Sequence, residues 1–290
     1  MPIPVSTTRT LKLTETADGV LDICQGSGAL LLRYVYKPST PRDESPRPYV
    51  HPLSTLSGEC LTNLRPNDHR WHHGLSYTIT TLNGSNFWGG PTYKKDQGYL
   101  FNTNHGFQKH VSWIEQNAYH LSHLIHWVGS SGILFLIEER SLVLTLISDL
   151  SWCLRWKSSF KNVSGTQLLL GNYYSSANLK GSHYSGLQFR GARDLLDEHG
   201  DDSITVNADG GLNGEDAIHS RSVKWVEWQC QKDSTQRRVQ IRFEDNLRPF
   251  PAFIRKSQPL MAIPFQYDKD ICMDINNTFE IDNTLTFTDL

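Results

Sequence analysis

Two neighbouring apolar stretches, Ala118-Tyr-His-Leu-Ser-His-Leu-Ile-His-Trp-Val128 and Ile133-Leu-Phe-Leu-Ile-Glu-Glu-Arg-Ser-Leu-Val-Leu-Thr-Leu-Ile147, decide the fold class of this chain. Both are rich in the β-branched and aromatic residues that favour strands. The second is interrupted by Glu138, Glu139 and Arg140, so it is not a membrane-spanning segment. The two stretches therefore predict three strands of a soluble β protein, over residues 118–128, 133–139 and 141–147.

Similar strand patterns continue on both sides of this region. Helical periodicity is nearly absent, and only Arg193–Glu198 suggests a single turn. Short turns rich in Gly, Asn, Asp and Ser separate the strands, which predicts an all-β fold, a large antiparallel sandwich. Further strands are expected at residues 11–14, 19–23, 29–36, 75–82, 151–160, 167–174, 203–207, 222–231, 237–243 and 279–287.

We expect one domain over residues 1–290, because neither an internal repeat nor a sharp shift in composition divides the chain. Residues 37–48 hold four prolines and several charges, which predicts an exposed loop. The net charge of −2 and evenly spread Lys and Arg argue against nucleic-acid binding. No signal-peptide pattern begins the chain, and five widely spaced cysteines suit a reducing compartment. A cytoplasmic protein that avoids membranes is expected, with its oligomeric state left open.

The His-rich stretch Arg65-Pro-Asn-Asp-His-Arg-Trp-His-His-Gly-Leu75 is the first candidate for a functional pocket. Imidazoles can bind metals or move protons near neutral pH. An extended backbone places alternate side chains on one face, and a helical turn brings residues four apart together. Both geometries put His69 and His73 side by side. The alternative is structural, with the three imidazoles, including His72, held in a buried polar network.

The chain resembles the DUF6807 family in several ordered motifs. These are Arg47-Pro-Tyr-Val-His-Pro-Leu53, Asp68-His-Arg-Trp-His-His-Gly-Leu75, Asn83-Gly-Ser-Asn-Phe-Trp-Gly-Gly-Pro-Thr-Tyr93, Glu138-Glu-Arg140, Tyr184-Ser-Gly-Leu-Gln-Phe-Arg-Gly191 and Pro249-Phe-Pro-Ala-Phe-Ile-Arg255. The resemblance implies a β-supersandwich similar to galactose mutarotases and other carbohydrate-active proteins. The "PmoA-like" label of the family names a membrane subunit of methane mono-oxygenase, which does not suit a chain without a spanning segment.

Three further residues are candidates for proton transfer. His105, in Asn102-Thr-Asn-His-Gly-Phe107, resembles a mutarotase loop in which a histidine protonates the sugar ring oxygen; an ordinary turn histidine is the alternative. Glu138 and Glu139 face opposite sides of a strand, so one of them should point inward. An inward glutamate near histidines would act as a general base, and the alternative is an ion pair with Arg140 or Arg190.

Substrate-binding candidates come from arginine and aromatic residues near these motifs. Arg190 is flanked by glycines that would allow a ligand close to the backbone. Its planar guanidinium suits a carboxylate or sugar hydroxyls. The remaining candidates for contact with a sugar or another flat ligand are Arg70, Trp71, Trp88 and Tyr184, with a place in the hydrophobic core as the alternative for the aromatic residues.

No dinucleotide, P-loop or nucleophile-elbow motif is present, so no organic cofactor is expected. A divalent metal on His69, His73 and His105 is an open alternative, since three such ligands suit catalytic zinc or manganese.

The leading hypothesis is an isomerase- or lyase-type enzyme for a sugar-like or glycosidic small molecule, acting by epimerisation, ring opening or elimination. The alternatives are an isomerase or cyclase of natural-product biosynthesis and a non-catalytic carbohydrate-binding accessory protein.

Overall fold

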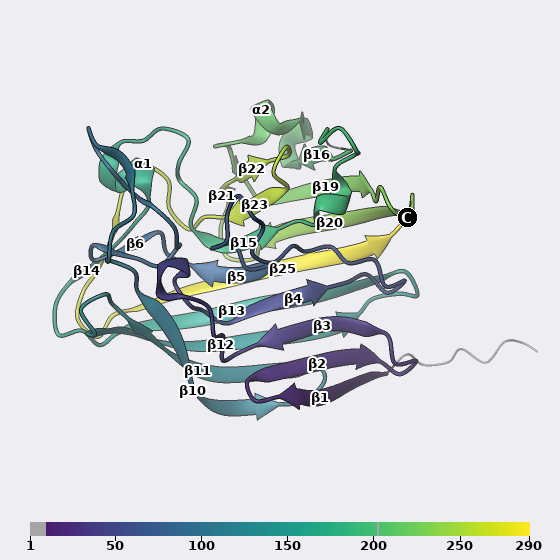
Figure 1. Cartoon of the computed structure of the whole chain (residues 1–290), viewed down its shortest axis with the longest axis horizontal. Helices are drawn as coiled ribbons and strands as arrows, with labels where there is room; N and C mark the ends of the chain where they lie inside the picture. Colours follow the sequence, from purple (N-terminus) through teal and green to yellow (C-terminus); the bar gives the residue numbers. More distant parts are fainter. Residues whose placement is uncertain (1–9, 202) are drawn as a thin grey trace, which may run out of the picture.

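Alternating apolar side chains build two large antiparallel sheets, drawn in Figure 1 from a computed structural model that describes residues 10–201 and 203–290. The first sheet has eight strands. In spatial order these are β1 (Leu11–Ala17), β2 (Val20–Gln25), β3 (Leu30–Val35), β4 (Tyr49–Leu53), β5 (Leu75–Thr78), β15 (Gly186–Arg190), β23 (Leu260–Ile263) and β22 (Phe253–Arg255).

The second sheet has nine strands and contains both of the long apolar stretches. Residues 133–139 and 141–147 join into one strand, because Arg140 continues the alternation without a break. In spatial order the strands are β10 (Phe107–Gln116), β11 (His120–Val128), β12 (Leu134–Leu146), β13 (Ser151–Asn162), β25 (Thr278–Asp289), β20 (Arg238–Asp245), β19 (Trp225–Gln231), β16 (Thr205–Ala208) and β17 (Leu212–Asn213).

Smaller elements lie at the ends of these sheets. The short strands are β6 (Thr81–Leu82), β7 (Ser85–Asn86), β14 (Leu168–Gly171) and β24 (Ile271–Met273) in one sheet, β8 (Thr92–Lys94) with β9 (Gly98–Leu100), and β18 (Ser222–Val223) with β21 (Phe250–Pro251). The helices are η1 (Arg42–Glu44), α1 (Tyr173–Ala177), η2 (Arg193–Leu195), η3 (Asp209–Gly211) and α2 (Glu215–Ile218).

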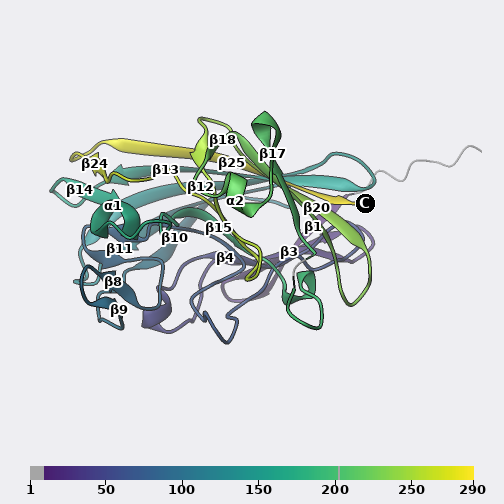
Figure 2. The ribbon, with the colours of Figure 1, turned by 90° about the horizontal axis from the view of Figure 1, so that it is seen from above.

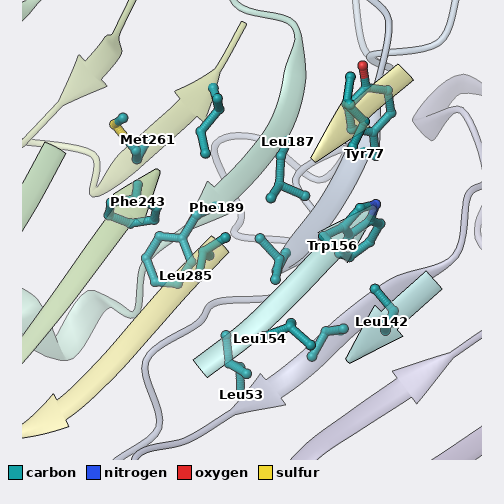
Figure 3. Packing of buried hydrophobic residues seen from close by; sticks show 14 of the residues in the cluster. Leu53, Tyr77, Leu142, Leu154, Trp156, Leu187, Phe189, Phe243, Met261 and Leu285 are labelled. Carbon is teal, nitrogen blue, oxygen red and sulfur yellow. The ribbon is translucent and has the colours of Figure 1, made fainter. Parts of the chain in front are cut away.

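The two sheets pack face to face as layers (Figure 2), so the prediction of an all-β antiparallel sandwich is confirmed. Leu142, Leu154 and Trp156 of the nine-stranded sheet belong to the same buried cluster as Leu187 and Phe189 of the eight-stranded sheet (Figure 3). Burying a leucine or phenylalanine side chain contributes about 1.5–3 kcal/mol, so this shared interior holds the layers together.

Two local predictions are corrected by the structure. The strand expected over residues 167–174 ends at Gly171, because Asn172 caps α1 by accepting hydrogen bonds from the backbone N–H groups of Tyr174 and Ser175. The loop at residues 37–48 is exposed only in its first part. From Glu44 onward it is largely buried, because the Arg47 side chain binds backbone carbonyl groups inside the protein.

Among the described residues, none of the helices is long and apolar enough to cross a membrane. Residues 1–9, which were predicted to lack a signal peptide, lie outside the described part of the chain.

Candidate functional site

A cavity of about 460 Å³ opens where the His-rich stretch meets loops at the end of the eight-stranded sheet. This volume is typical of a small-molecule site. Five aromatic side chains line it: Trp71, Trp88, Tyr99, Tyr184 and Phe253. Its polar lining side chains are His69, His72, Ser182, Arg255 and Gln258.

The His-rich stretch forms a turn at the cavity wall. The backbone N–H of His69 donates to Pro66 O (3.0 Å), and that of His72 donates to His69 O (3.0 Å). The chain is therefore neither extended nor helical here. His69 stacks on His72, with ring centroids 5.0 Å apart, whereas His73 points into the interior. The prediction that His69 and His73 lie together is wrong, because the turn separates them.

His72 is held as a neutral imidazole that can donate a hydrogen bond. Its Nδ1 lies 3.3 Å from Nη1 of Arg190. Arginine only donates, so Nδ1 accepts and the ring proton of the neutral form is on Nε2. Burial, followed by the charge of Arg190, holds the pKa of His72 well below its usual range. Within the described part of the chain Nε2 has no protein partner, so its N–H is available to a ligand in the cavity.

His69 has the complementary arrangement. Its Nδ1 lies 3.0 Å from Oδ2 of Asp68. Burial opposes ionisation of Asp68, but the hydrogen bond with His69 and the charge of Arg190 hold the pKa of that carboxyl below its usual value. An ionised Asp68 accepts from Nδ1–H, which leaves the lone pair of a neutral His69 on Nε2. Asp68 and His69 therefore form a carboxylate–imidazole pair suited to proton transfer.

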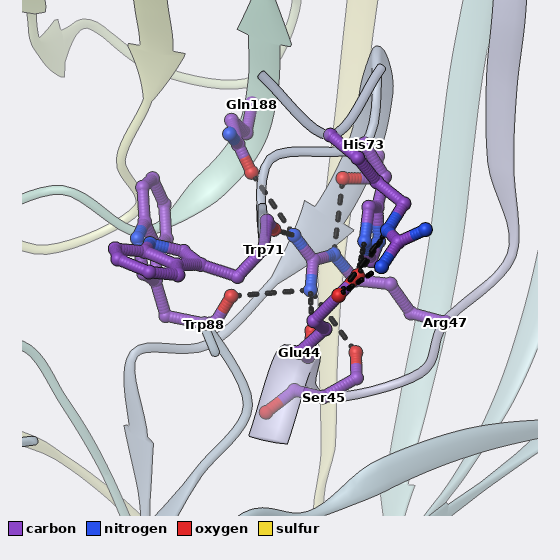
Figure 4. A network of polar contacts seen from close by, with 9 residues as sticks. Glu44, Ser45, Arg47, Trp71, His73, Trp88 and Gln188 are labelled. Atoms are coloured by element: carbon purple, nitrogen blue, oxygen red, sulfur yellow. Dashed lines mark hydrogen bonds and ion pairs between the residues drawn. The ribbon is translucent and has the colours of Figure 1, made fainter. Parts of the chain in front are cut away.

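Arg47 holds two of the aromatic walls in place, although it does not line the cavity (Figure 4). Its guanidinium is fully buried, and burial lowers its pKa to about 9. A buried charge is tolerated only when polar partners surround it, as they do here. The acceptors are Ser76 Oγ (3.1 Å), Gln188 Oε1 (3.3 Å) and the backbone oxygens of Glu44 (3.1 Å), Ser45 (3.0 Å), Trp71 (2.7 Å) and Trp88 (3.1 Å).

His73, predicted to be catalytic, belongs to a buried structural network instead. Its Nε2 lies 3.0 Å from Oε2 of Glu44, which also binds Arg65. Burial outweighs the hydrogen bond to Glu44 and lowers the pKa of His73 to about 4. His73 is therefore neutral, and its N–H holds the segment that ends in Glu44 against the His-rich turn.

Four other predicted site residues also lie outside the cavity lining. His105 is buried behind the wall, with Nε2 2.7 Å from Gly90 O. Glu138 points inward as predicted but forms the expected alternative, an ion pair with Arg140 (2.8 Å) between the sheets. Glu139 and Arg70 are exposed side chains. None of these four contributes to the lining, so their predicted roles in proton transfer or substrate contact are corrected.

Arg190 is likewise behind the wall rather than on it, because its guanidinium is directed at His72 and Asp68. The ligand set of His69, His73 and His105 is not assembled. Across residues 10–201 and 203–290, no group of three or more His, Cys, Asp or Glu side chains is placed to hold a metal ion.

The lining residues predicted from the sequence and placed at the cavity are His69, Trp71, His72, Trp88 and Tyr184. Among the lining residues, Tyr99, Phe253 and Arg255 were missed. Asp68, which pairs with His69 but does not itself line the cavity, was missed as well. Asp68 and the Phe253-Ile-Arg255 segment both lie in motifs that carry the family resemblance, which was the available signal.

The fold and the cavity together define an all-β sandwich protein with an aromatic, histidine-bearing cavity of small-molecule size. The chain belongs to DUF6807, a family of unknown function, whose model matches residues 24–288. The family assignment is confirmed. A search of curated proteins found no match.

Solved structures show distant likenesses. An α-galactosidase of glycoside hydrolase family 36 from Geobacillus stearothermophilus, in complex with raffinose, matches 97% of this chain with a TM-score of 0.40 and 10% identity. This chain spans 41% of that α-galactosidase. HI1317 matches 97% of this chain and 100% of its own, with a TM-score of 0.33 and 10% identity. A GalM/aldose epimerase homologue from C. elegans matches 98% of this chain and 99% of its own, with a TM-score of 0.33 and 6% identity.

Proposed function

We propose that this protein is an enzyme that performs acid/base chemistry on a sugar-like small molecule in the aromatic cavity. The observation that carries the proposal is the Asp68–His69 pair, with Nδ1 and Oδ2 3.0 Å apart, stacked on the neutral His72. A base oriented by a carboxylate beside a fixed hydrogen-bond donor is the arrangement that proton abstraction requires.

In this mechanism Nε2 of His69 takes a proton from a ring carbon or hydroxyl of the ligand. The imidazolium that forms is stabilised by the carboxylate of Asp68. Nε2–H of His72 donates a hydrogen bond to the ligand oxygen on which negative charge develops. His69 then returns the proton, either to carbon in an isomerisation or to the departing oxygen in an elimination.

The aromatic side chains that line the cavity bind the ligand in this proposal. Tryptophan and tyrosine rings can pack against the C–H face of a sugar, while the hydroxyl groups of Tyr99 and Tyr184, 3.1 Å apart, are placed for polar contact. The abundance of rings also favours a second candidate, an isomerase or cyclase acting on a flat polycyclic molecule of natural-product type.

Exchange of ligand C–H hydrogen for solvent deuterium, followed by NMR, tests the proposal with a panel of neutral and acidic monosaccharides and keto-sugars. The wild-type protein should catalyse exchange for at least one member of the panel. His69→Gln should slow that exchange by about a hundredfold or more, because general acid–base catalysis contributes factors of that size. Asp68→Asn should also slow it, since the imidazole loses its orienting carboxylate.

Arg70→Gln is the matched control, because Arg70 is exposed on the same turn and should leave exchange unchanged. Sugar binding without exchange by the wild-type protein would instead indicate a carbohydrate-binding accessory protein. Binding of flat aromatic ligands in preference to every sugar would indicate the second candidate.

A further inference from the structure

We propose that the ligand of this cavity carries a carboxylate group and that Arg255 binds it, so that the substrate class is an acidic sugar. This inference rests on the proposed function and names the class of molecule that the same site takes. It arises from the wall that lies apart from the histidine turn, where β22 ends and the chain turns toward β23.

Arg255 is the single arginine or lysine among the lining residues, and within the described chain none of the lining residues is an aspartate or glutamate. Its side chain is 38% exposed, so the charge is accessible from the cavity. An arginine facing a cavity without a lining carboxylate favours an anionic ligand, because the planar guanidinium matches a carboxylate with two parallel hydrogen bonds.

The protein contacts of Arg255 leave much of its donor capacity unused. Nη1 donates to Ile254 O (2.8 Å) and to Nδ1 of His219 (3.1 Å). Nη2 lies 3.4 Å from Gly181 O, and the Nε–H has no acceptor in the described part of the chain. The face of the guanidinium rests on the Phe253 ring, 4.8 Å from its centroid. These contacts orient the group without neutralising its charge.

A neighbouring carboxylate offsets the charge of Arg255 without satisfying its donors. Glu215 forms an ion pair with Nη1 at 3.8 Å, and its other oxygen accepts the backbone N–H of Lys256 at 2.8 Å. At 3.8 Å it makes no hydrogen bond with Arg255. Burial, then Arg255, lowers the pKa of His219 to about 4, so this imidazole is neutral. Beyond the His72 wall, Arg190 and Arg193 both lie near Asp68, which adds further positive charge.

The experiment compares binding of matched sugar pairs that differ in one oxidised carbon: D-glucuronate with D-glucose, and D-galacturonate with D-galactose, by calorimetry or NMR titration. The wild-type protein should bind at least one uronate about tenfold or more tightly than its neutral partner, because hydrogen bonds to a charged group are stronger than those between neutral groups. Arg255→Gln should remove that preference, and Arg255→Lys should restore part of it.

Arg238→Gln is the matched control, since Arg238 is exposed on β20 and does not line the cavity. Equal affinities for uronates and neutral sugars, no binding of either uronate, or an unchanged preference in Arg255→Gln would overturn the proposal. Tighter binding of glucose 6-phosphate than of the uronates would assign the arginine to a phosphate instead. Loss of stability in both Arg255→Gln and Glu215→Gln without any effect on binding would show a structural pair.

These outcomes are separate from those of the proposed function. The exchange reaction depends on His69 and Asp68, and it would remain if the anion preference failed. Conversely, an Arg255-dependent preference without any exchange would support the anion site and contradict the catalytic proposal.

Discussion

The consecutive residues His72 and His73 show how the partner of one ring nitrogen decides the role of a histidine. His72 accepts from Arg190 and lines the cavity, and its remaining N–H has no partner among the described residues. His73 uses its N–H on Glu44, and its Nδ1 is buried without a partner among the described residues. The first arrangement leaves a donor for a ligand, and the second stabilises the fold.

The adjacent residues Glu138 and Glu139 provide a test of how a single side chain's partner decides its role, because one is buried in an ion pair and the other is exposed. Glu138 is fully buried and binds Arg140, Trp127 and Ser158. Glu138→Gln should lower the free energy of unfolding by about 3–5 kcal/mol, because it leaves the Arg140 charge buried without its partner. Glu139→Gln, on the exposed side of the same strand, should change it by less than about 0.5 kcal/mol. Urea denaturation measures both, and similar values for the two variants would contradict this assignment.

At the scale of elements, the cavity wall depends on close contact between the His-rich turn and the Phe87–Gly90 segment. Gly90 has φ of +66°, and a β-carbon at this position would overlap the indole ring of Trp71. The same segment is held by His105 through Gly90 O and by Arg47 through Trp88 O. A glycine is therefore required here by packing as well as by backbone conformation.

Gly90→Ala should destabilise the protein and displace Trp71 from the cavity wall. Gly84→Ala is the matched control, because Gly84 also has a positive φ (+81°) but has open space where the β-carbon would lie. Both variants carry backbone strain of about 1–3 kcal/mol. Gly90→Ala should lose more free energy of unfolding than this strain accounts for, and its tryptophan fluorescence should change. Neither effect should occur in Gly84→Ala. Equal stability of the two variants would mean that Trp71 moves aside without cost.

At the scale of the whole molecule, buried neutral histidines predict a loss of stability in mild acid. Burial lowers the pKa of His183 to about 4, below the usual 6.5 of an unfolded chain. Between these two values the unfolded state binds more protons, so stability is complete above about pH 6.5 and falls as the pH drops toward 4. His219 and Arg255, which face His183, both lower its pKa further.

The free energy of unfolding, measured by urea titration at several pH values, should fall by up to about 1.4 kcal/mol per pH unit for each such histidine. His183→Gln should reduce this slope between pH 6.5 and 4. His199→Gln should not, because His199 is a highly exposed side chain. An unchanged slope in His183→Gln would show that this imidazole does not contribute to the acid lability.

The sequence by itself determined that the molecule is an antiparallel sandwich, because strand alternation is a local property of stretches such as β11 and β12. It also identified the turn that carries His69 and His72, since that cluster of imidazoles and a tryptophan is visible in a single segment. It did not reveal the direction of each imidazole. A strand or a helix would have placed His69 and His73 on the same face, whereas the observed short turn separates them.

Only the tertiary structure decided which groups form the site. Arg190 meets His72 and Asp68 across 118 and 122 residues of chain, and Arg255 reaches the cavity from a strand near the C-terminus. Such contacts depend on the order of strands, with β15 placed between β5 and β23. Strand order follows from how the two sheets bury their apolar faces against each other, and this is a property of the whole chain rather than of any single motif.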